Sequence, residues 1–488
     1  MVKKSRKLIQ WKVKDFARVL AFFCLHTLIL LAGFAFILYI NANFDYLSAW
    51  NFITSEGTAG NFVYLIIAIV MIVIGTFLFF YSENRDFIFK TRNVNMTFIV
   101  LEISVAILFA VGKYLIYARP FALCALLILL LVDKRTAIFM NTTCCLLMFL
   151  IDAFLSINPI EEHLLYSSFI IGWTTSIIAI HLVNGSSSRV KVFFMGFIIA
   201  IPVIICALCL EFDDALTNPF IIIVAGFTSG MSSVVLMMAL LPFFEKIFNR
   251  TTDYKLAELT DNRSPVITKL RNEASGTYHH CLDVSNLAEA CAVAIGENPL
   301  LARACAYYHD IGKLENPEFF TENQRGYNPH IELTPELSTD TIRSHAKYGY
   351  ELAKKFHLPD ELADITLQHH GTLPIRYFYV QASKFSEEPL NIENFSYPGP
   401  KPQSKIAAII MIADGAEAKC RTLPVRDFEN VDKAVREIIE ERLDYEQFDE
   451  CDLTTKDLDI IRKTIVESLT GVYHGRVAYP ERIKRNRN

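Results

Sequence analysis

Long apolar runs fill the first half of the chain and are separated by short polar segments. Most of them reach about 20 residues, the length that an α-helix needs to cross the hydrocarbon core of a bilayer. The run that begins at Arg119-Pro120 is short, which favours a broken or tilted helix. Eight spans are predicted, the first ending at Ile40 and the others at about 62–81, 97–117, 120–132, 136–155, 164–183, 190–210 and 219–243.

Basic residues predict the orientation of these spans. Seven Lys and Arg residues precede the first apolar run, which is too long for a signal peptide and lacks a small-residue cleavage site, so an uncleaved anchor is expected. Alternate loops carry 14 Lys and Arg residues on one side and two, Lys113 and Arg119, on the other. The positive-inside rule therefore places the N-terminus in the cytoplasm, and an even number of spans returns the chain there after Phe244.

The hydrophobic pattern changes after Phe244 to that of amphipathic helices joined by polar loops. Of the 99 charged residues, 70 lie in this second half, and no alternating run predicts a β-strand. The predicted fold class is all-α, a multi-span membrane domain followed by a cytoplasmic helical bundle. The expected domains are an anchor with a short extracellular segment at 1–61, seven spans at 62–244, a connector at 245–275 and the bundle at 276–488.

Composition excludes several classes of protein. A hydrophobic content of 52% and a mean hydropathy of +0.30 are too high for an ordinary soluble enzyme. The net charge is −5 and no basic patch with interleaved aromatic residues is present, so no nucleic-acid polymer is expected as a partner. The 11 cysteines are scattered, and their one CxxC, Cys206 to Cys209, lies in an apolar run, which indicates neither a disulfide framework nor a zinc ribbon.

Four ionisable residues fall inside predicted spans: His26, Glu102, Asp152 and His181. Such residues are functional candidates because burying a charge in the bilayer is costly. The alternative is hydrogen bonding between helices or a place near the interface. Among the four, Glu102 is the strongest candidate for a ligand or coupling contact.

The pair His309-Asp310 offers two metal ligands inside an otherwise apolar helical run. Neighbours on a helix point about 100° apart, so the pair cannot hold one ion as histidines four residues apart would. It suits a cluster in which the imidazole binds one metal and the carboxylate bridges to a second. For an isolated pair, a hydrogen-bonded core histidine beside a helix-end acid would be the simpler interpretation.

Further histidines make the metal interpretation stronger, since nine of the 12 lie after residue 278. The candidates come from separate helices, as in bundles that build an inward-facing metal site. Imidazole and carboxylate without thiolate favour iron or manganese, and seven ligands are too many for one ion, so two divalent ions are expected. The candidate ligands are His280, His309, Asp310, His345, His369, His370 and Asp414.

Ordered sequence blocks around these residues resemble the seven-transmembrane HD-domain hydrolase family, whose members are cytoplasm-facing phosphodiesterases of cyclic di-AMP. The resemblance also covers the seven spans before the bundle. One departure is the short segment 41–61, where the family usually carries a large extracellular domain. The blocks are Gly276-Thr277-Tyr278-His279-His280, His309-Asp310-Ile311-Gly312-Lys313, His369-His370-Gly371-Thr372 and Tyr397-Pro398-Gly399-Pro400-Lys401-Pro402, with Asp414 following.

The resemblance implies roles for single residues. One metal would take His280, His309, Asp310 and Asp414, and the second would take Asp310, His345, His369 and His370. Asp310 and Lys313 would be catalytic, and Lys313 and Arg421 would meet a substrate phosphate, the alternative for each being a solvated surface charge. His279, His330, His357 and His474 match no ligand position.

The expected reaction is hydrolysis of cyclic di-AMP to pApA in the cytoplasm. A water shared by two cations loses its proton readily, and the hydroxide would attack phosphorus in line. Alternatives are a nucleotide-binding receptor without turnover, or a hydrolase of another cyclic dinucleotide or guanosine tetraphosphate. Gly371-Thr372-Leu373-Pro374 stands where the cyclic di-GMP branch carries Gly-Tyr-Pro, which disfavours that substrate. The bilayer is an expected partner, and a homodimer is left open.

Overall fold

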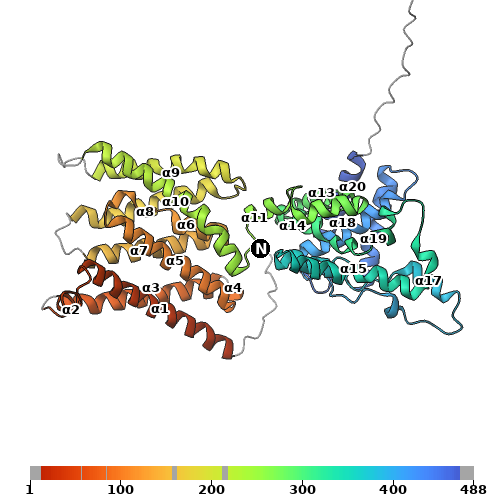
Figure 1. Ribbon diagram of the computed structural model, residues 1–488, viewed down its shortest axis with the longest axis horizontal. Coiled ribbons are helices and arrows are strands. Elements are labelled where there is room, and N and C mark those ends of the chain that lie inside the picture. The colour runs from red at the N-terminus through yellow and green to blue at the C-terminus, as the bar shows by residue number, and fades with distance from the viewer. Residues whose placement is uncertain (1–12, 56–57, 84, 156–161, 211–217, 473–488) are drawn as a thin grey trace, which may run out of the picture. The chain divides into compact units, whose positions relative to one another are not determined.

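The structure, a computed structural model, describes residues 13–55, 58–83, 85–155, 162–210 and 218–472 (Figure 1). The chain divides into two compact units, Met1–Thr252 and Asp253–Asn488. Within the described residues both units consist of helices, and the one β-bridge joins Pro374 to Ser396. The all-α prediction is confirmed.

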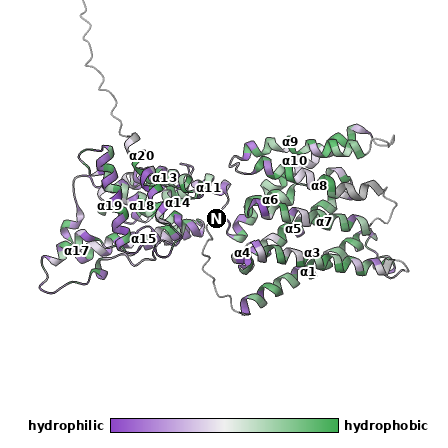
Figure 2. Ribbon diagram, turned by 180° about the vertical axis from the view of Figure 1, so that it is seen from behind, coloured by the Kyte–Doolittle hydropathy of each residue, from purple (hydrophilic) through white to green (hydrophobic). Residues whose placement is uncertain are grey.

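The first unit contains the apolar helices, which Figure 2 colours mostly as hydrophobic. Among the described residues, six helices are long and apolar enough to cross a membrane, and the segments Ile116–Leu131 and Phe169–Val183 are shorter apolar helices. The count of eight spans therefore stays a prediction. The helices are α1 Val13–Asn41, α2 Tyr46–Thr54, α3 Thr58–Glu83, α4 Arg85–Phe89, α5 Thr91–Gly112, α6 Leu123–Leu131, α7 Lys134–Leu155, α8 Glu162–Val183, α9 Arg189–Leu210 and α10 Pro219–Phe248, with a 3₁₀ turn η1 at Ile116–Ala118.

The chain is interrupted between α5 and α6, as the proline after Arg119 predicts. The helix α5 ends at Gly112, five residues before the end of the predicted span, and eight of the nine residues of α6 are buried. Backbone groups at the break find partners on other helices: Ser176 donates to the carbonyl of Phe121 (3.0 Å), and the amide of Ala122 donates to Ser233 (3.3 Å). These bonds satisfy groups that the bilayer would leave without a partner.

Arg119 is not a loop charge, as the orientation count treats it. Its side chain is 4% exposed, and its guanidinium donates two hydrogen bonds to Asp152 on α7, at 2.6 and 2.8 Å. The other predicted intraspan groups are also bonded between helices. His26 on α1 contacts Glu102 on α5 (2.9 Å) and Asn95 (3.2 Å).

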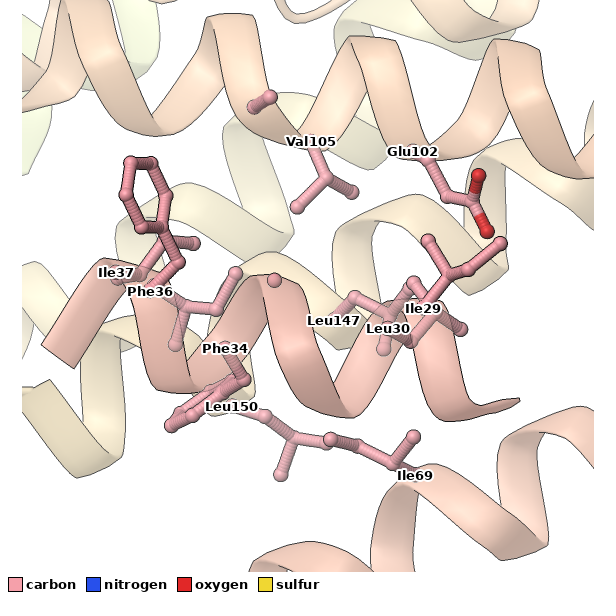
Figure 3. A pocket seen from close by; sticks show the side chains of 13 residues that line it. Ile29, Leu30, Phe34, Phe36, Ile37, Ile69, Glu102, Val105, Leu147 and Leu150 are labelled. Atoms are coloured by element: carbon pink, nitrogen blue, oxygen red, sulfur yellow. The ribbon is translucent and has the colours of Figure 1, made fainter. Parts of the chain in front are cut away.

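An apolar pocket of about 150 Å³ lies among α1, α3, α5 and α7. Figure 3 shows its lining, in which Glu102 bears the one charged group among the labelled side chains. The opposite wall includes Ile29, Leu30 and Phe34 of α1. Glu102 is therefore at the edge of a cavity as well as in a bond with His26.

The second unit is a helical bundle around a large hydrophobic core, with a second small cluster formed by Phe378, Ala382 and Phe395. Leu256, Ile267 and Leu270, from the predicted connector, are buried in that core, so residues 253–275 pack with the bundle. The helices are α11 Asp253–Leu259, α12 Pro265–Glu273, α13 Ser275–Ile295, α14 Pro299–Tyr308, α15 Pro335–Lys355, α16 Asp360–Gln368, α17 Arg376–Ser383, α18 Lys405–Arg421, α19 Phe428–Asp444 and α20 Thr455–Val472. The 3₁₀ turns are η2 Ile311–Leu314, η3 Pro317–Phe319, η4 Thr321–Asn323, η5 Pro329–Glu332 and η6 Ile392–Phe395.

Candidate metal centre

The bundle brings all seven predicted ligands into one cluster. They come from five α-helices and one 3₁₀ turn or from the ends of these elements, and all but His370 and Asp414 are at most 5% exposed. The ligands are His280 on α13, His309 at the C-cap of α14, Asp310 at the N-cap of η2, His345 on α15, His369 and His370 just after α16, and Asp414 on α18.

Asp310 lies at the centre, and its two oxygens face different imidazoles. Its Oδ2 is 3.5 Å from Nε2 of His280 and 3.2 Å from Nε2 of His309. Its Oδ1 is 3.4 Å from Nε2 of His345 and 3.5 Å from Nε2 of His369. One carboxylate thus faces two sets of nitrogen donors.

The remaining ligands complete two groups whose donor atoms lie within 4.8 Å of one another, and Cys281 forms a third such group with His309 and Asp310. The first group is His280, His309 and Asp414, in which His280 Nε2 is 3.0 Å from Asp414 Oδ1. The second group is Asp310, His345, His369 and His370. This grouping has the same composition as the two metal sites that the family resemblance implies, with Asp310 between them.

Gly312 allows η2 to come close enough to α15 for this arrangement. A Cβ at Gly312 would lie 1.8 Å from the carbonyl oxygen of His345 and 2.7 Å from the amide nitrogen of Gly349. No side chain fits there, because real Cβ contacts do not come closer than about 3 Å. The glycine two residues after Asp310 thereby sets the distance between Asp310 and His345.

Backbone carbonyls hold three of the imidazoles with Nε2 turned toward the cluster. The Nδ1 atoms of His309, His345 and His369 lie 2.7, 2.6 and 3.1 Å from carbonyl oxygens three or four residues earlier on the same helix. A carbonyl only accepts, so each Nδ1 carries a proton and each Nε2 is the atom that could offer a lone pair to a bound cation. This is the tautomer that a metal ligand needs.

The charges of the cluster also fit divalent ions. Neither Nε2 of His309 nor Oδ1 of Asp310 has a hydrogen-bond partner among the described residues, although both atoms are buried. Such orphaned buried atoms are costly in a folded protein. Cations placed between the two ligand groups would satisfy both, so the donor set fits the ions that the sequence predicts.

Burial and neighbouring charges shift the pKa values of the ligands in opposite directions. Burial lowers the pKa of His345 to about 3, which keeps this imidazole neutral. Burial also disfavours the charged form of His280, but hydrogen bonds to Asp414 and Glu417 outweigh it and raise its pKa to about 10. Burial acts against ionisation of Asp310 too, yet Lys313 and His309 hold its pKa well below the usual range.

Lys313 lies against the cluster. Its ammonium is 2.7 Å from Asp310 Oδ2 and 2.8 Å from Glu322 Oε1, and its side chain is 12% exposed. Glu322 also accepts from the hydroxyl of Thr277 (3.1 Å), so η4 is tied to the start of α13. Lys313 is therefore a buried cation beside the candidate ligands, and the solvated surface charge considered for it is wrong.

Arg421 is connected to the cluster through another side chain, Glu417. Its guanidinium pairs with Glu417, one turn earlier on α18, and its side chain is 43% exposed. Glu417 in turn accepts from Nδ1 of His280 (2.8 Å). Glu417 was not among the predicted site residues: it lies three residues after Asp414 on the same face of α18, but this spacing alone does not identify His280 as its partner.

The four histidines predicted to lie outside the ligand set fall as follows. His279 and His357 are exposed, and Nε2 of the half-buried His330 lies 3.0 Å from the carbonyl oxygen of Phe319. His474 lies outside the described residues. Tyr397, from the Tyr-Pro-Gly-Pro block, stacks on His370 with ring centroids 4.3 Å apart.

Two family descriptions match the chain. Residues 61–252 match the family described as "7TM receptor with intracellular HD hydrolase", and residues 277–419 match the HD domain. The two matched segments correspond to the apolar helices and to the bundle that carries the cluster.

Curated relatives are also similar to the chain. The chain is 36% identical over 443 residues to "Cyclic-di-AMP phosphodiesterase PgpH" of Bacillus subtilis, covering 85% of this chain and 60% of the relative. It is 43% identical over 257 residues to the protein of the same name from Listeria monocytogenes, covering 52% of this chain and 36% of the relative. The chain thus spans less than two thirds of the length of these relatives.

A solved structure is also similar. The crystal structure of the L. monocytogenes PgpH HD domain in complex with cyclic di-AMP shares 46% identity with this chain. The match covers 44% of this chain and all of that one, with a TM-score of 0.42.

Proposed function

Since the chain belongs to the family of 7TM receptors with an intracellular HD hydrolase, we propose that it is a membrane-bound, metal-dependent phosphodiesterase. The proposed reaction is hydrolysis of cyclic di-AMP to pApA on the cytoplasmic side of the membrane. The names of the two curated relatives support this substrate. The observation that carries the proposal is the position of Asp310, with one oxygen toward each group of imidazoles.

The proposed cofactors are two divalent ions, iron or manganese. His280, His309, Asp310 and Asp414 would hold one, and Asp310, His345, His369 and His370 would hold the other, as the two donor groups suggest. When bound, such ions lower the pKa of a water molecule and stabilise negative charge on phosphoryl oxygens. The absence of thiolate from both groups supports iron or manganese over a structural zinc site.

Residues of the chain position the substrate and its charge. The proposed role of Lys313 is to neutralise charge that develops on a phosphoryl oxygen, because its ammonium already lies beside Asp310. Glu322 holds the ammonium in that place from the other side. Tyr397 fixes the plane of His370 by stacking on its ring.

The distribution of basic residues supports the cytoplasmic location of the site. The loops that would lie on the side of the N-terminus carry 14 Lys and Arg residues, and the transfer of Arg119 into a buried ion pair leaves Lys113 as the single exception. All seven candidate ligands come from one chain, so the site does not require a second copy.

The test is a substrate panel with the full chain in detergent, loaded with Mn²⁺ or, without oxygen, with Fe²⁺. Cyclic di-AMP, cyclic di-GMP and guanosine tetraphosphate are each incubated, and products are identified by liquid chromatography and mass spectrometry. The expected result is pApA from cyclic di-AMP, abolished in His280→Ala and retained in His279→Ala, whose side chain is exposed.

Other outcomes would replace the proposal. Cyclic di-AMP that is bound but recovered intact would indicate a receptor. Faster turnover of another nucleotide would indicate a hydrolase with a different substrate. Equal activity in the His280 and His279 variants would remove the metal centre from the reaction.

A further inference from the structure

His280 is held differently from the three imidazoles that donate to backbone carbonyls. Its Nδ1 lies 2.8 Å from a carboxylate oxygen of Glu417. A carboxylate carries a full negative charge, and a charged acceptor makes a stronger hydrogen bond than a neutral carbonyl. The first group therefore contains one imidazole held by a carboxylate, His280, beside His309 on its carbonyl, whereas His345 and His369 of the second group are both held by carbonyls.

Glu417 is built into the site rather than placed on the surface. It is 6% exposed and lies three residues after Asp414 on α18, so the same helix supplies a candidate ligand and the group that holds His280. Its other oxygen pairs with Arg421, four residues further along the helix. Arg421, Glu417 and His280 thus form a chain of contacts that ends at the cluster.

We propose that Glu417 is a positioning residue that makes the His280–His309–Asp414 group the tighter of the two metal sites. The inference rests on the proposed function, because it assumes that both groups bind divalent ions. A carboxylate that accepts a hydrogen bond from Nδ1 of an imidazole fixes the orientation of the ring and makes Nε2 a stronger ligand for a metal ion. It also adds negative charge near the ion. The group with His345 and His369 has neutral carbonyls in this place.

The same geometry gives Arg421 a different role from the one expected from the resemblance. Its guanidinium faces Glu417, so Arg421 orients that carboxylate and reaches the ion through it. A residue that met a substrate phosphate would change the KM for the substrate and leave metal affinity unchanged. A residue that acts through Glu417 changes metal affinity.

The experiment titrates the full, metal-free chain in detergent with Mn²⁺ against a competing chelator and fits two stepwise constants. Glu417→Gln keeps the shape and an acceptor oxygen but removes the charge. The tighter constant is expected to weaken by about 10–100-fold while the weaker one changes by no more than about twofold. Glu437→Gln is the matched control, because Glu437 pairs with Lys419 on the surface.

Two further variants keep the result interpretable. Glu417→Asp retains the charge and is expected to recover part of the lost affinity, which a merely structural role would not produce. Arg421→Gln is expected to weaken the same constant by a smaller factor. A raised KM in Arg421→Gln, with both Mn²⁺ constants unchanged, would overturn the role given to Arg421.

The inference and the proposed function fail in different ways. If the wild-type chain binds two Mn²⁺ ions and Glu417→Gln binds them with the same two constants, the positioning role is wrong and the hydrolase proposal stands. If Glu417→Gln weakens the looser site instead, the order of the two sites is reversed and the inference is wrong. A wild-type chain that binds no Mn²⁺ overturns both.

Discussion

Each half of the chain buries ionisable side chains, and the two halves treat them differently. In the membrane unit, Arg119 meets Asp152 in a two-bond ion pair, and His26 meets Glu102 and Asn95. These groups pair with one another across helices. In the bundle, Nε2 of His309 and Oδ1 of Asp310 are buried and have no hydrogen-bond partner among the described residues.

The difference separates two uses of buried charge. A closed pair is neutral and directional, so it fixes helices in place and needs nothing from outside. An open cluster of carboxylates and imidazoles gains stability when a cation completes it. Burial of charge alone would have pointed to both places, and the convergence of several imidazoles on the two oxygens of one carboxylate singles out the bundle.

The largest expected effect comes from Asp310→Ala, which removes the oxygens that face both groups. The chain should lose both ions, and hydrolysis of cyclic di-AMP should fall by on the order of 10³-fold or more, since metal ions supply several kcal/mol of barrier reduction. Metal analysis and initial rates measure the two losses together. A variant that keeps two ions would show that Asp310 is not shared.

The closed pair is tested next by Arg119→Met, which strands the carboxylate of Asp152. Removing one partner of a buried ion pair costs about 3–5 kcal/mol, so the membrane unit should unfold much more readily in detergent. In the double variant Arg119→Met with Asp152→Leu, most of that stability should return because no unpaired charge is left. An equal loss of stability in the double variant would contradict the view that each member of the pair serves only to neutralise the other.

The variant Lys313→Met tests whether Lys313 acts on the substrate or supports the metal ligands. The rate should fall by about 10²-fold while two ions stay bound, because Lys313 contributes charge and no lone pair to the metals. Lys419→Met, which removes a cation paired with Glu437 on the surface, should leave the rate unchanged. Loss of an ion in the Lys313 variant would place this residue in support of the metal site instead.

The smallest effect is expected from Glu102→Gln, at the edge of the apolar pocket. Hydrogen bonds between helices in membranes contribute about 0.5–1.5 kcal/mol, so the helices should be only slightly less stable. Hydrolysis by the bundle should be unchanged if the bond to His26 is all that Glu102 provides. A large change in rate would return Glu102 to the role of a ligand or coupling contact.

More of the bundle than of the membrane unit could be predicted from the sequence, and the reason is physical. Ligand chemistry restricts residue types so strongly that His309-Asp310, with His280 and Asp414, could be recognised without coordinates. Apolar runs carry no such restriction, so the end of α5 at Gly112 and the burial of Arg119 were not predictable. An arginine beside a proline has the same appearance in a loop and in a buried helix break.

Glu417 marks the limit within the bundle. Glutamate on a helix is most often a solvated surface residue, and nothing in its neighbours identifies the imidazole that it holds. His280 lies 137 positions earlier in the chain. The contact exists because α13 packs against α18, and this pairing of helices cannot be read from either segment alone.

The most direct test of the account is to locate the ions themselves, by anomalous X-ray scattering from crystals of the full chain grown with Mn²⁺. The account predicts two anomalous peaks about 3.5–4 Å apart, one on each side of the carboxylate of Asp310. A single peak bound by one group, or no peak in a chain that folds as described, would contradict it.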